Sequence, residues 1–281
     1  MVYKPKELPE DINLTPVHPL VDFAYLLGTV VVFSAVVYLI LGAIATQLVT
    51  RISPEMETKI GQQLLATVPT TATESNFKQR QYLQNLLTSL DKSNPNNSVP
   101  LTIYLQESAQ ANAIIIPGGH IIVTTTLLKE AESENELAFV LAHEIGHHAA
   151  KDTLKGLGRS LVFLTVASAL GIGSGNADIV TLTGSISDLH YSRQQESAAD
   201  IYALSSLVEL YEHGEASLDF FQRIQAKNRD NRGKLSAYFS THPLTQVRID
   251  ALSRVAVEKG WQMTGEITDL PDRIFQQKLD N

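Results

Sequence analysis

Two histidines and a glutamate between residues 140 and 152 have the spacing of a metal site. In the stretch "VLAHEIGHHAAKD", His143 and His147 are four residues apart, which on a helix with about 3.6 residues per turn places both imidazoles on one face. Two neutral imidazoles one turn apart suit a tetrahedral zinc ion, and Glu144 can reach a metal-bound water without binding the metal. His148 points about 140° away from His143, so it is not expected to be a ligand. The spacing therefore predicts a zinc ion with a general base beside it.

A solvated helix face with incidental histidines is the alternative interpretation of this stretch. The surrounding residues "ELAFVLAHEIGHHAA" oppose it because most of them are apolar. Gly146 costs a helix up to about 1 kcal/mol relative to alanine, which indicates that another segment approaches the backbone closely there. Ser133, with Glu136 three residues later, predicts a capping box at the start of this helix.

A second helical stretch offers the third protein ligand that a catalytic zinc ion needs. In "HYSRQQESAADIYALSSLVEL", residues 190–210, Glu196 and Asp200 are four residues apart and share one helix face. One carboxylate can bind zinc while the other accepts a hydrogen bond from the back of a ligating imidazole. Such a pair more often lies on a solvated face, but the alanines and isoleucine around it predict burial, and buried carboxylates need partners.

Composition narrows the chemistry and the partners. The formal net charge of −8 over 281 residues argues against nucleic-acid binding, since a nucleic-acid-binding protein needs a basic face to displace counterions from phosphates. The absence of cysteine excludes disulfides, iron–sulfur clusters and thiolate zinc sites. Any metal must therefore be bound by histidine, aspartate or glutamate.

An uncharged run near the N-terminus predicts a membrane anchor. Residues 23–50 carry no charged side chain and are bracketed by Asp22 and Arg51, and about 20 apolar residues cross a hydrocarbon core of about 30 Å. A signal peptide and a buried core helix are the alternatives, but a signal peptide has a basic start and a shorter apolar run. We therefore expect a tail at residues 1–22, a single transmembrane helix at 23–50 and a catalytic domain at 51–281, on a side of the membrane that the flanking charges do not settle.

Hydrophobic periodicity predicts a mainly helical domain after the anchor. Apolar residues three and four apart indicate amphipathic helices, and β-branched runs broken by a Pro-Gly-Gly turn indicate a small sheet. The expected helices lie at 54–68 and 74–93, the expected strands at 101–108, 112–116 and 120–126, and everything beyond about Leu127 is expected to be helical.

A second uncharged run spans residues 160–177. Only about 11 of its residues are strongly apolar, which is too few to cross a bilayer. A buried helix is therefore favoured over a hairpin that dips into the membrane.

Taken together, the motifs resemble a known family. "LAHEIGHH" is followed by "YSRQQESAAD", with "NAIIIPGGHIIVTTTLL" upstream and "STHPLTQVRIDAL" near the C-terminus. This order is similar to that of the gluzincin group of membrane-associated zinc metallopeptidases, which comprises the HtpX heat-shock proteases, the CAAX prenyl proteases and the BepA-type periplasmic proteases. The resemblance covers about residues 55–255. It implies an α+β, mainly α-helical zincin catalytic domain with a small β-sheet, joined to the predicted N-terminal transmembrane helix.

The resemblance also implies the composition of the metal site. One zinc ion per chain would be bound by His143, His147 and Glu196. Glu144 would act as general base and acid, and Asp200 would support a ligand from behind.

Two further residues receive roles through the C-terminal motif. The resemblance implies that His242, from "THP", helps to stabilise the oxyanion and that Arg248 holds this segment in place. From the sequence alone, an ordinary turn histidine before Pro243 explains His242 equally well.

These features predict a membrane-anchored zinc metalloendopeptidase in protein quality control. Its partners would be the lipid bilayer and polypeptide substrates that are unfolded or membrane-associated. A single anchor departs from the multi-span members of the group and favours a tethered soluble catalytic domain. An extended substrate could pair with an exposed strand edge near Ile121–Thr125, although ordinary pairing within the sheet explains these residues equally well.

The alternative function is a non-proteolytic chaperone or scaffold that keeps the fold with a structural metal. A structural zinc site usually closes its fourth position with a protein ligand and has no use for a base beside a water molecule. The presence of Glu144 therefore favours the enzyme.

Overall fold

The computed structural model describes residues 18–70, 74–91, 99–170, 190–219, 222, 241–242 and 246–271. In chain order its elements are α1 (Pro19–Val49), α2 (Pro54–Leu65), α3 (Glu74–Asp91), β1 (Thr102–Gln106), β2 (Ala113–Ile116), β3 (His120–Thr124), α4 (Thr125–Glu130), α5 (Glu134–Ala149), α6 (Asp152–Ala169), α8 (Arg193–Tyr211) and α11 (Gln246–Lys259). This arrangement confirms the predicted α+β, mainly helical fold with a small sheet and one long apolar N-terminal helix. Residues 1–17 of the predicted tail lie outside the described part, and the predicted domain division stays a prediction.

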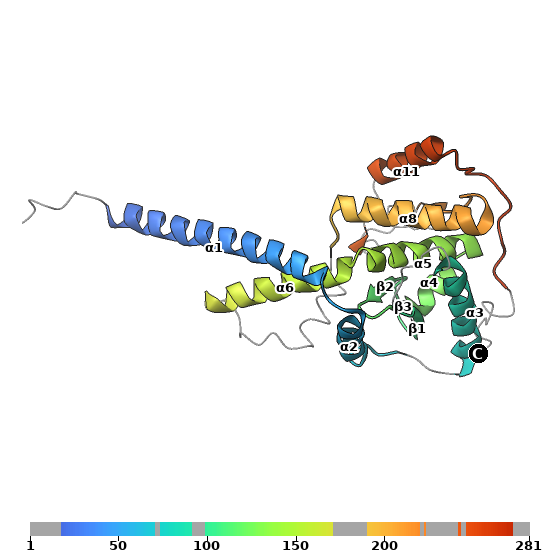
Figure 1. Cartoon of the computed structure of the whole chain (residues 1–281), viewed down its shortest axis with the longest axis horizontal. Coiled ribbons are helices and arrows are strands. Elements are labelled where there is room, and N and C mark those ends of the chain that lie inside the picture. Colours follow the sequence, from blue (N-terminus) through green and yellow to red (C-terminus); the bar gives the residue numbers. More distant parts are fainter. Residues whose placement is uncertain are drawn as a thin grey trace, which may run out of the picture.

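Helix α5 forms the centre of the body (Figure 1). Every residue from Asn135 to His148 is buried, because α8 packs along one side of the helix and β2 along another. Phe139 is fully buried, and α3 also packs against α5. The apolar neighbours of the paired histidines thus form a core, and the solvated-face interpretation of this stretch is wrong.

Different local interactions determine where α5 begins and where it ends. At the start, the Ser133 hydroxyl accepts a hydrogen bond from Glu136 N, as predicted, but the Glu136 carboxylate accepts from Glu132 N and so does not complete a capping box on Ser133. At the end, Lys151 adopts a left-handed conformation with φ 54°. This turn ends the helix and starts α6 at Asp152.

The three strands form one sheet in the order β1-β3-β2. Strands β2 and β3 are antiparallel and joined by the predicted turn, where Gly118 and Gly119 have φ of 81° and 75°, values that favour glycine. Strand β1 pairs in parallel with the other side of β3. The proposal of an exposed edge near Ile121–Thr125 is therefore wrong, since β3 is the central strand. The edge that faces α5 belongs to β2.

Helices α1 and α6 extend from the body side by side (Figure 1). Among the described residues, only α1 is long and apolar enough to cross a membrane, with a mean hydropathy of 2.5 in its most apolar window and 6% of that window buried. The prediction of a buried helix in the second uncharged run is wrong. Residues 160–170 are half-buried or exposed, because they lie beyond the body, where α1 is the described element that packs against this part of α6. Residues 171–177 of that run lie outside the described part.

The chain after α11 departs from the predicted all-helical C-terminal half. Residues 261–271 form no helix or strand. Their backbone is instead bound to the body, where Thr268 O accepts from Glu134 N and Thr268 N donates to the Asn135 side chain. These contacts support the start of α5 from a distant part of the sequence.

Gly146 marks the closest approach of α5 and α8. A Cβ atom at this position would lie 3.0 Å from Ala199 Cα and 3.2 Å from Tyr202 Cβ. The expected close approach at Gly146 is thereby confirmed, and its cause is the backbone of α8. The absent side chain lets the two helices meet at the level of the paired histidines.

We expect Gly146→Val to loosen the packing of α5 against α8. The added side chain overfills a packed contact, which costs about 1–3 kcal/mol, and thermal unfolding of the purified full-length chain in detergent measures the loss. The matched control is Ala149→Val, an exposed position on the same helix, which carries the β-branched side chain without the clash. Equal melting temperatures of the two variants would contradict the assigned role of Gly146.

Candidate metal centre

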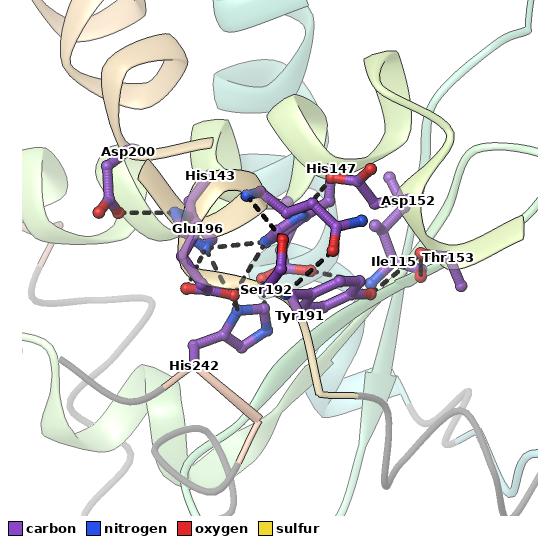
Figure 2. Close-up of polar contacts among 12 residues, drawn as sticks. Ile115, His143, His147, Asp152, Thr153, Tyr191, Ser192, Glu196, Asp200 and His242 are labelled. Carbon is purple, nitrogen blue, oxygen red and sulfur yellow. Dashed lines mark hydrogen bonds and ion pairs between the residues drawn. The ribbon is translucent and has the colours of Figure 1, made fainter. Parts of the chain in front are cut away.

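Four buried side chains converge between α5 and α8 (Figure 2). His143 and His147 come from α5, Glu196 comes from the first turns of α8, and His242 comes from the chain shortly before α11. One nitrogen or oxygen of each side chain lies within 4.8 Å of the corresponding atoms of the others. The structure thus brings together the three ligands expected from the sequence and adds His242 to them.

The spacing of these atoms fits a single metal ion. The Nε2 atoms of His143 and His147 are 3.1 Å apart, and Nε2 of His147 lies 3.4 Å from Oε1 of Glu196. Nδ1 of His242 lies 3.3 Å from Nε2 of His143 and 2.9 Å from Oε1 of Glu196. Atoms that share one zinc ion in tetrahedral geometry lie about 3.3 Å apart, since bonds from zinc to nitrogen and oxygen are about 2.0–2.2 Å long. Buried imidazole and carboxylate donors at this spacing are suited to a divalent transition metal.

The start of α8 fixes the position of Glu196. The Ser192 hydroxyl accepts a hydrogen bond from Gln195 N, and the Gln195 side chain accepts one from Ser192 N. This capping box fixes the N-terminus of α8 one turn before the Glu196 carboxylate. Tyr191, just before the cap, stacks on the His147 ring with centroids 4.0 Å apart. Sequence reasoning missed both features, although the "SRQQ" pattern carries the signal of the box.

Carboxylates support both imidazoles from behind. Asp200 Oδ1 lies 3.0 Å from Nδ1 of His143, as the spacing of Glu196 and Asp200 predicted for one of the two carboxylates. Asp152 Oδ2 lies 3.1 Å from Nδ1 of His147, and sequence reasoning missed this residue. It follows the break at Lys151, so helical periodicity could not place it. The two contacts leave Nε2 of each imidazole facing the centre.

Arg248 joins the two carboxylates of α8. Its Nε and Nη2 donate to Asp200 at 2.7 and 2.6 Å, and its Nη1 lies 2.7 Å from Oε2 of Glu196. The guanidinium is buried with 7% exposure, so its positive charge offsets two carboxylates that would otherwise be costly to bury. Arg248 lies in α11, and it links that helix to the metal centre.

Glu144 lies beside the cluster with one oxygen bound and one directed elsewhere. Its Oε2 accepts a hydrogen bond from Ile115 N of β2 at 3.1 Å. Its Oε1 is buried, 3.6 Å from Nε2 of His242, and has no hydrogen-bond partner within the described ranges. Burial raises the pKa of Glu144 to about 7, against the lowering effect of His143 and His147. A carboxylate with this pKa can take up and release a proton near neutral pH.

His242 is fully integrated in the cluster. The ring is 2% exposed and stacks near Tyr191 with centroids 5.2 Å apart. Burial alone would raise the pKa of Glu196, but hydrogen bonds from His147 and His242 outweigh it and hold that pKa well below its usual range. The turn-histidine interpretation of His242 therefore does not hold, since the ring contacts the charged groups of the site.

His148 lies outside the cluster, as its angle on the helix predicted. Its Nδ1 faces Glu57 Oε1 of α2 at 3.4 Å. Lys151 reaches the same carboxylate at 3.8 Å and donates to Ile52 O at 2.9 Å. His148, the residue after the second histidine, thus ties α5 to α2, the first helix after α1.

Comparison with known proteins places these motifs in a family. The model of "Peptidase family M48" matches residues 70–256. The chain is 31% identical over 184 residues to the putative beta-barrel assembly-enhancing protease of Vibrio cholerae, covering 60% of this chain and 37% of that protein. It is 28% identical over 157 residues to the mitochondrial metalloendopeptidase OMA1 of Saccharomyces cerevisiae, covering 52% of this chain and 44% of that protein. For the mitochondrial metalloendopeptidase OMA1 of Bos taurus the identity is 31% over 172 residues, covering 54% of this chain and 32% of that protein. The chain thus spans less than half the length of these relatives.

Asp152→Asn tests whether the missed carboxylate supports metal binding. The amide keeps the shape but loses the charge that orients the His147 ring, and changes of this kind lower metal affinity by about 10–100-fold. Competition with a chromogenic chelator measures the affinity of the purified chain for Zn²⁺. Asp250→Asn on the exposed face of α11 is the control, and it is expected to bind like the wild type. Unchanged affinity in Asp152→Asn would exclude this role.

Proposed function

The chain belongs to peptidase family M48, and from this premise we propose that it is a zinc-dependent endopeptidase anchored in a membrane by α1. The observation that carries the proposal is the site itself. Donor atoms at metal spacing lie beside a buried carboxylate with a pKa of about 7. A site built only to hold a metal has no need of that carboxylate.

We assign the metal to His143, His147 and Glu196. Zinc is the metal that suits two imidazoles and a carboxylate in a buried tetrahedral site and leaves one position for water. When bound, zinc supplies a Lewis acid that polarises a peptide carbonyl and lowers the pKa of water from about 15.7 toward about 7. Asp200 and Asp152 hold the two imidazoles by their Nδ1 atoms, so that both Nε2 atoms carry the lone pair toward the metal.

Glu144 carries the proton in this proposal. Ile115 N fixes its Oε2, so Oε1 is the atom that takes a proton from the attacking water and returns it to the leaving amine. The raised pKa suits both steps, because the protonated and the ionised form are close in free energy near neutral pH. The backbone of β2 is therefore part of the catalytic arrangement.

His242 is the group that we assign to the substrate's carbonyl oxygen. Its Nδ1 is engaged with Glu196, and its Nε2 lies on the side of Glu144. With both ring nitrogens protonated, Nδ1 keeps its hydrogen bond to Glu196 and Nε2 can donate a second one to the developing oxyanion. Arg248 is a positioning residue in this proposal, because it orients Glu196 and Asp200 and fixes α11 beside them.

The cellular role proposed here is quality control of unfolded or membrane-associated polypeptides. The Vibrio cholerae relative is named for enhancing β-barrel assembly, and the other relatives are metalloendopeptidases by name. The apolar helix α1 supports a membrane location with one crossing. The lipid bilayer and polypeptide chains are thus the partners that we propose.

One observation favours the alternative of a chaperone or scaffold with a structural metal. Nδ1 of His242 lies among the possible ligand atoms, and four protein ligands are typical of a closed structural zinc site. The two functions differ in what His242 does for the metal. In the enzyme three ligands suffice, whereas in a closed site the fourth is needed.

Glu144→Gln tests the enzyme directly. We expect the variant to degrade casein about 10²–10⁴-fold more slowly than the wild type, because the amide cannot accept the proton. Zinc content, measured by elemental analysis of both proteins, is expected to be equal. Glu209→Gln, an exposed position on α8, is the matched control with wild-type activity. Casein degradation that persists in Glu144→Gln would overturn the assigned role of Glu144.

His242→Ala separates the enzyme from the closed metal site. For the enzyme we expect about one zinc per chain and an undiminished rise in melting temperature on adding zinc, with casein degradation slowed about 10²–10³-fold. His147→Ala is the comparison, since it removes an assigned ligand and should lose the zinc. A His242→Ala protein that loses zinc to the same extent as His147→Ala would favour the structural metal.

A further inference from the structure

Helix α6 leaves the catalytic body beside α1 and runs antiparallel to it. The position of a Cβ atom on Gly158 lies 3.5 Å from Ala45 Cβ and 3.6 Å from Val49 Cγ2, near the body. Further out, the rings of Phe163 and Tyr38 meet edge to face with centroids 6.3 Å apart. With increasing distance from the body, residue numbers thus rise along α6 and fall along α1, as expected for antiparallel helices. Small residues at the contact allow helices to pack closely, as they do in membranes.

Among the residues that the structure describes, the outer part of α6 presents large apolar side chains that are partly exposed to solvent. Leu161, Phe163 and Leu170 are 41%, 57% and 46% exposed. Residues 160–170 carry no charge, and the last charged residue before them is Arg159. Large exposed apolar residues gathered on one element mark a contact surface, and here that surface continues the exposed apolar surface of α1.

The uncharged parts of α1 and α6 begin at the same distance from the body. Arg159 follows Gly158, which lies against Ala45 and Val49, and the first charge after α1 is Arg51. Beyond this level both helices are uncharged as far as the described part of α6 extends. Arginines at such a boundary suit a membrane interface, since their long side chains reach the headgroups.

The length of the uncharged part fits partial insertion. Residues 160–170 span about 16 Å at about 1.5 Å per residue, which is roughly half of a hydrocarbon core of about 30 Å. Helix α6 begins in the body at Asp152, and the chain is back in the body at α8. Residues 160–170 would therefore enter the bilayer from the side on which the body lies.

We propose that residues 160–170 of α6 are a second membrane-embedded segment, which lies beside α1 and whose exposed face is covered by lipid acyl chains. The proposal rests on the anchoring role of α1 given above. In place of a domain tethered by one helix, it gives a body that is held in the membrane by two packed helices.

The inference also places the active site near the bilayer. Asp152, the first residue of α6, supports His147. Seven residues separate it from Arg159, about 10 Å along a helix. The metal centre would therefore stand about one helix diameter above the headgroups. Polypeptide segments that emerge from the bilayer or lie on its surface are the substrate class that this position selects.

Single cysteines in the full-length chain test the proposal, and the natural sequence contains none. Phe163→Cys and Leu161→Cys probe α6 at two positions, so that one disturbed contact with α1 does not decide the result. Val36→Cys on α1 is the lipid-exposed reference, and Val257→Cys, 82% exposed on α11, is the aqueous reference. Each variant is labelled with an environment-sensitive NBD fluorophore and reconstituted into phosphatidylcholine vesicles. Quenching by iodide in the buffer and by brominated phosphatidylcholine is then measured.

We expect the α6 probes to resemble Val36→Cys. Their emission should be blue-shifted and quenched by brominated lipid, with an iodide quenching constant several-fold below that of Val257→Cys. Iodide access at α6 combined with lipid quenching at Val36 would overturn this inference and leave the anchor intact. Iodide access at both helices would overturn the anchor as well. Shielding of α6 from both quenchers would show that protein, such as a second copy, covers the surface, and would likewise overturn the proposal.

Discussion

The burial of several carboxylates in one small volume is the constraint on which the rest of the structure depends. Ionised carboxylates are costly to remove from water unless opposite charges or hydrogen-bond donors meet them. The fold meets this cost with three imidazoles, one guanidinium and one backbone N–H group, and a divalent cation would complete the compensation. The buried acids are Glu144, Asp152, Glu196 and Asp200, and the groups that face them are His143, His147, His242, Arg248 and Ile115 N. The compensating groups come from α5, β2, α11 and the chain just before α11, which explains why β2 packs against α5 and α11 packs against α8.

The same set of contacts connects the metal centre to α1 and α6, the two helices that extend from the body. Asp152 orients His147 and is at the same time the first residue of α6. Next to it, His148 and Lys151 hold Glu57 of α2, the helix that follows α1. From the metal centre, Asp152 thus leads directly into α6, which packs on α1, and Glu57 lies a few residues after the end of α1. The position of the metal centre relative to α1 and α6 is defined, because the links are helices and buried ion pairs.

The sheet contributes chemistry as well as support. Ile115 of β2 donates its N–H group to Glu144 and accepts a hydrogen bond from Thr153 through its carbonyl oxygen. Thr153 in turn contacts the hydroxyl of Tyr191, which stacks on His147. An edge strand whose outward backbone groups bind α5 and the start of α6 fixes Glu144 relative to His143 and His147. The central position of β3 serves this arrangement, since it holds β2 in register by pairing along one side.

The sequence by itself determined the features that depend on one helix. The four-residue spacings of His143 with His147 and of Glu196 with Asp200 place each pair on one face because helix geometry is local. The long apolar helix α1 could be predicted for the same reason, since it follows from one continuous stretch of sequence. Gly146 indicated a close contact, but not that α8 makes it. Only the tertiary structure decided which carboxylate supports His147, since the helix breaks at Lys151 and periodicity ends there. It also decided that His242 joins the ligand cluster, that β3 is central and that α6 lies exposed beside α1. These are contacts between segments far apart in the chain, and no local pattern specifies which distant surface a side chain will meet.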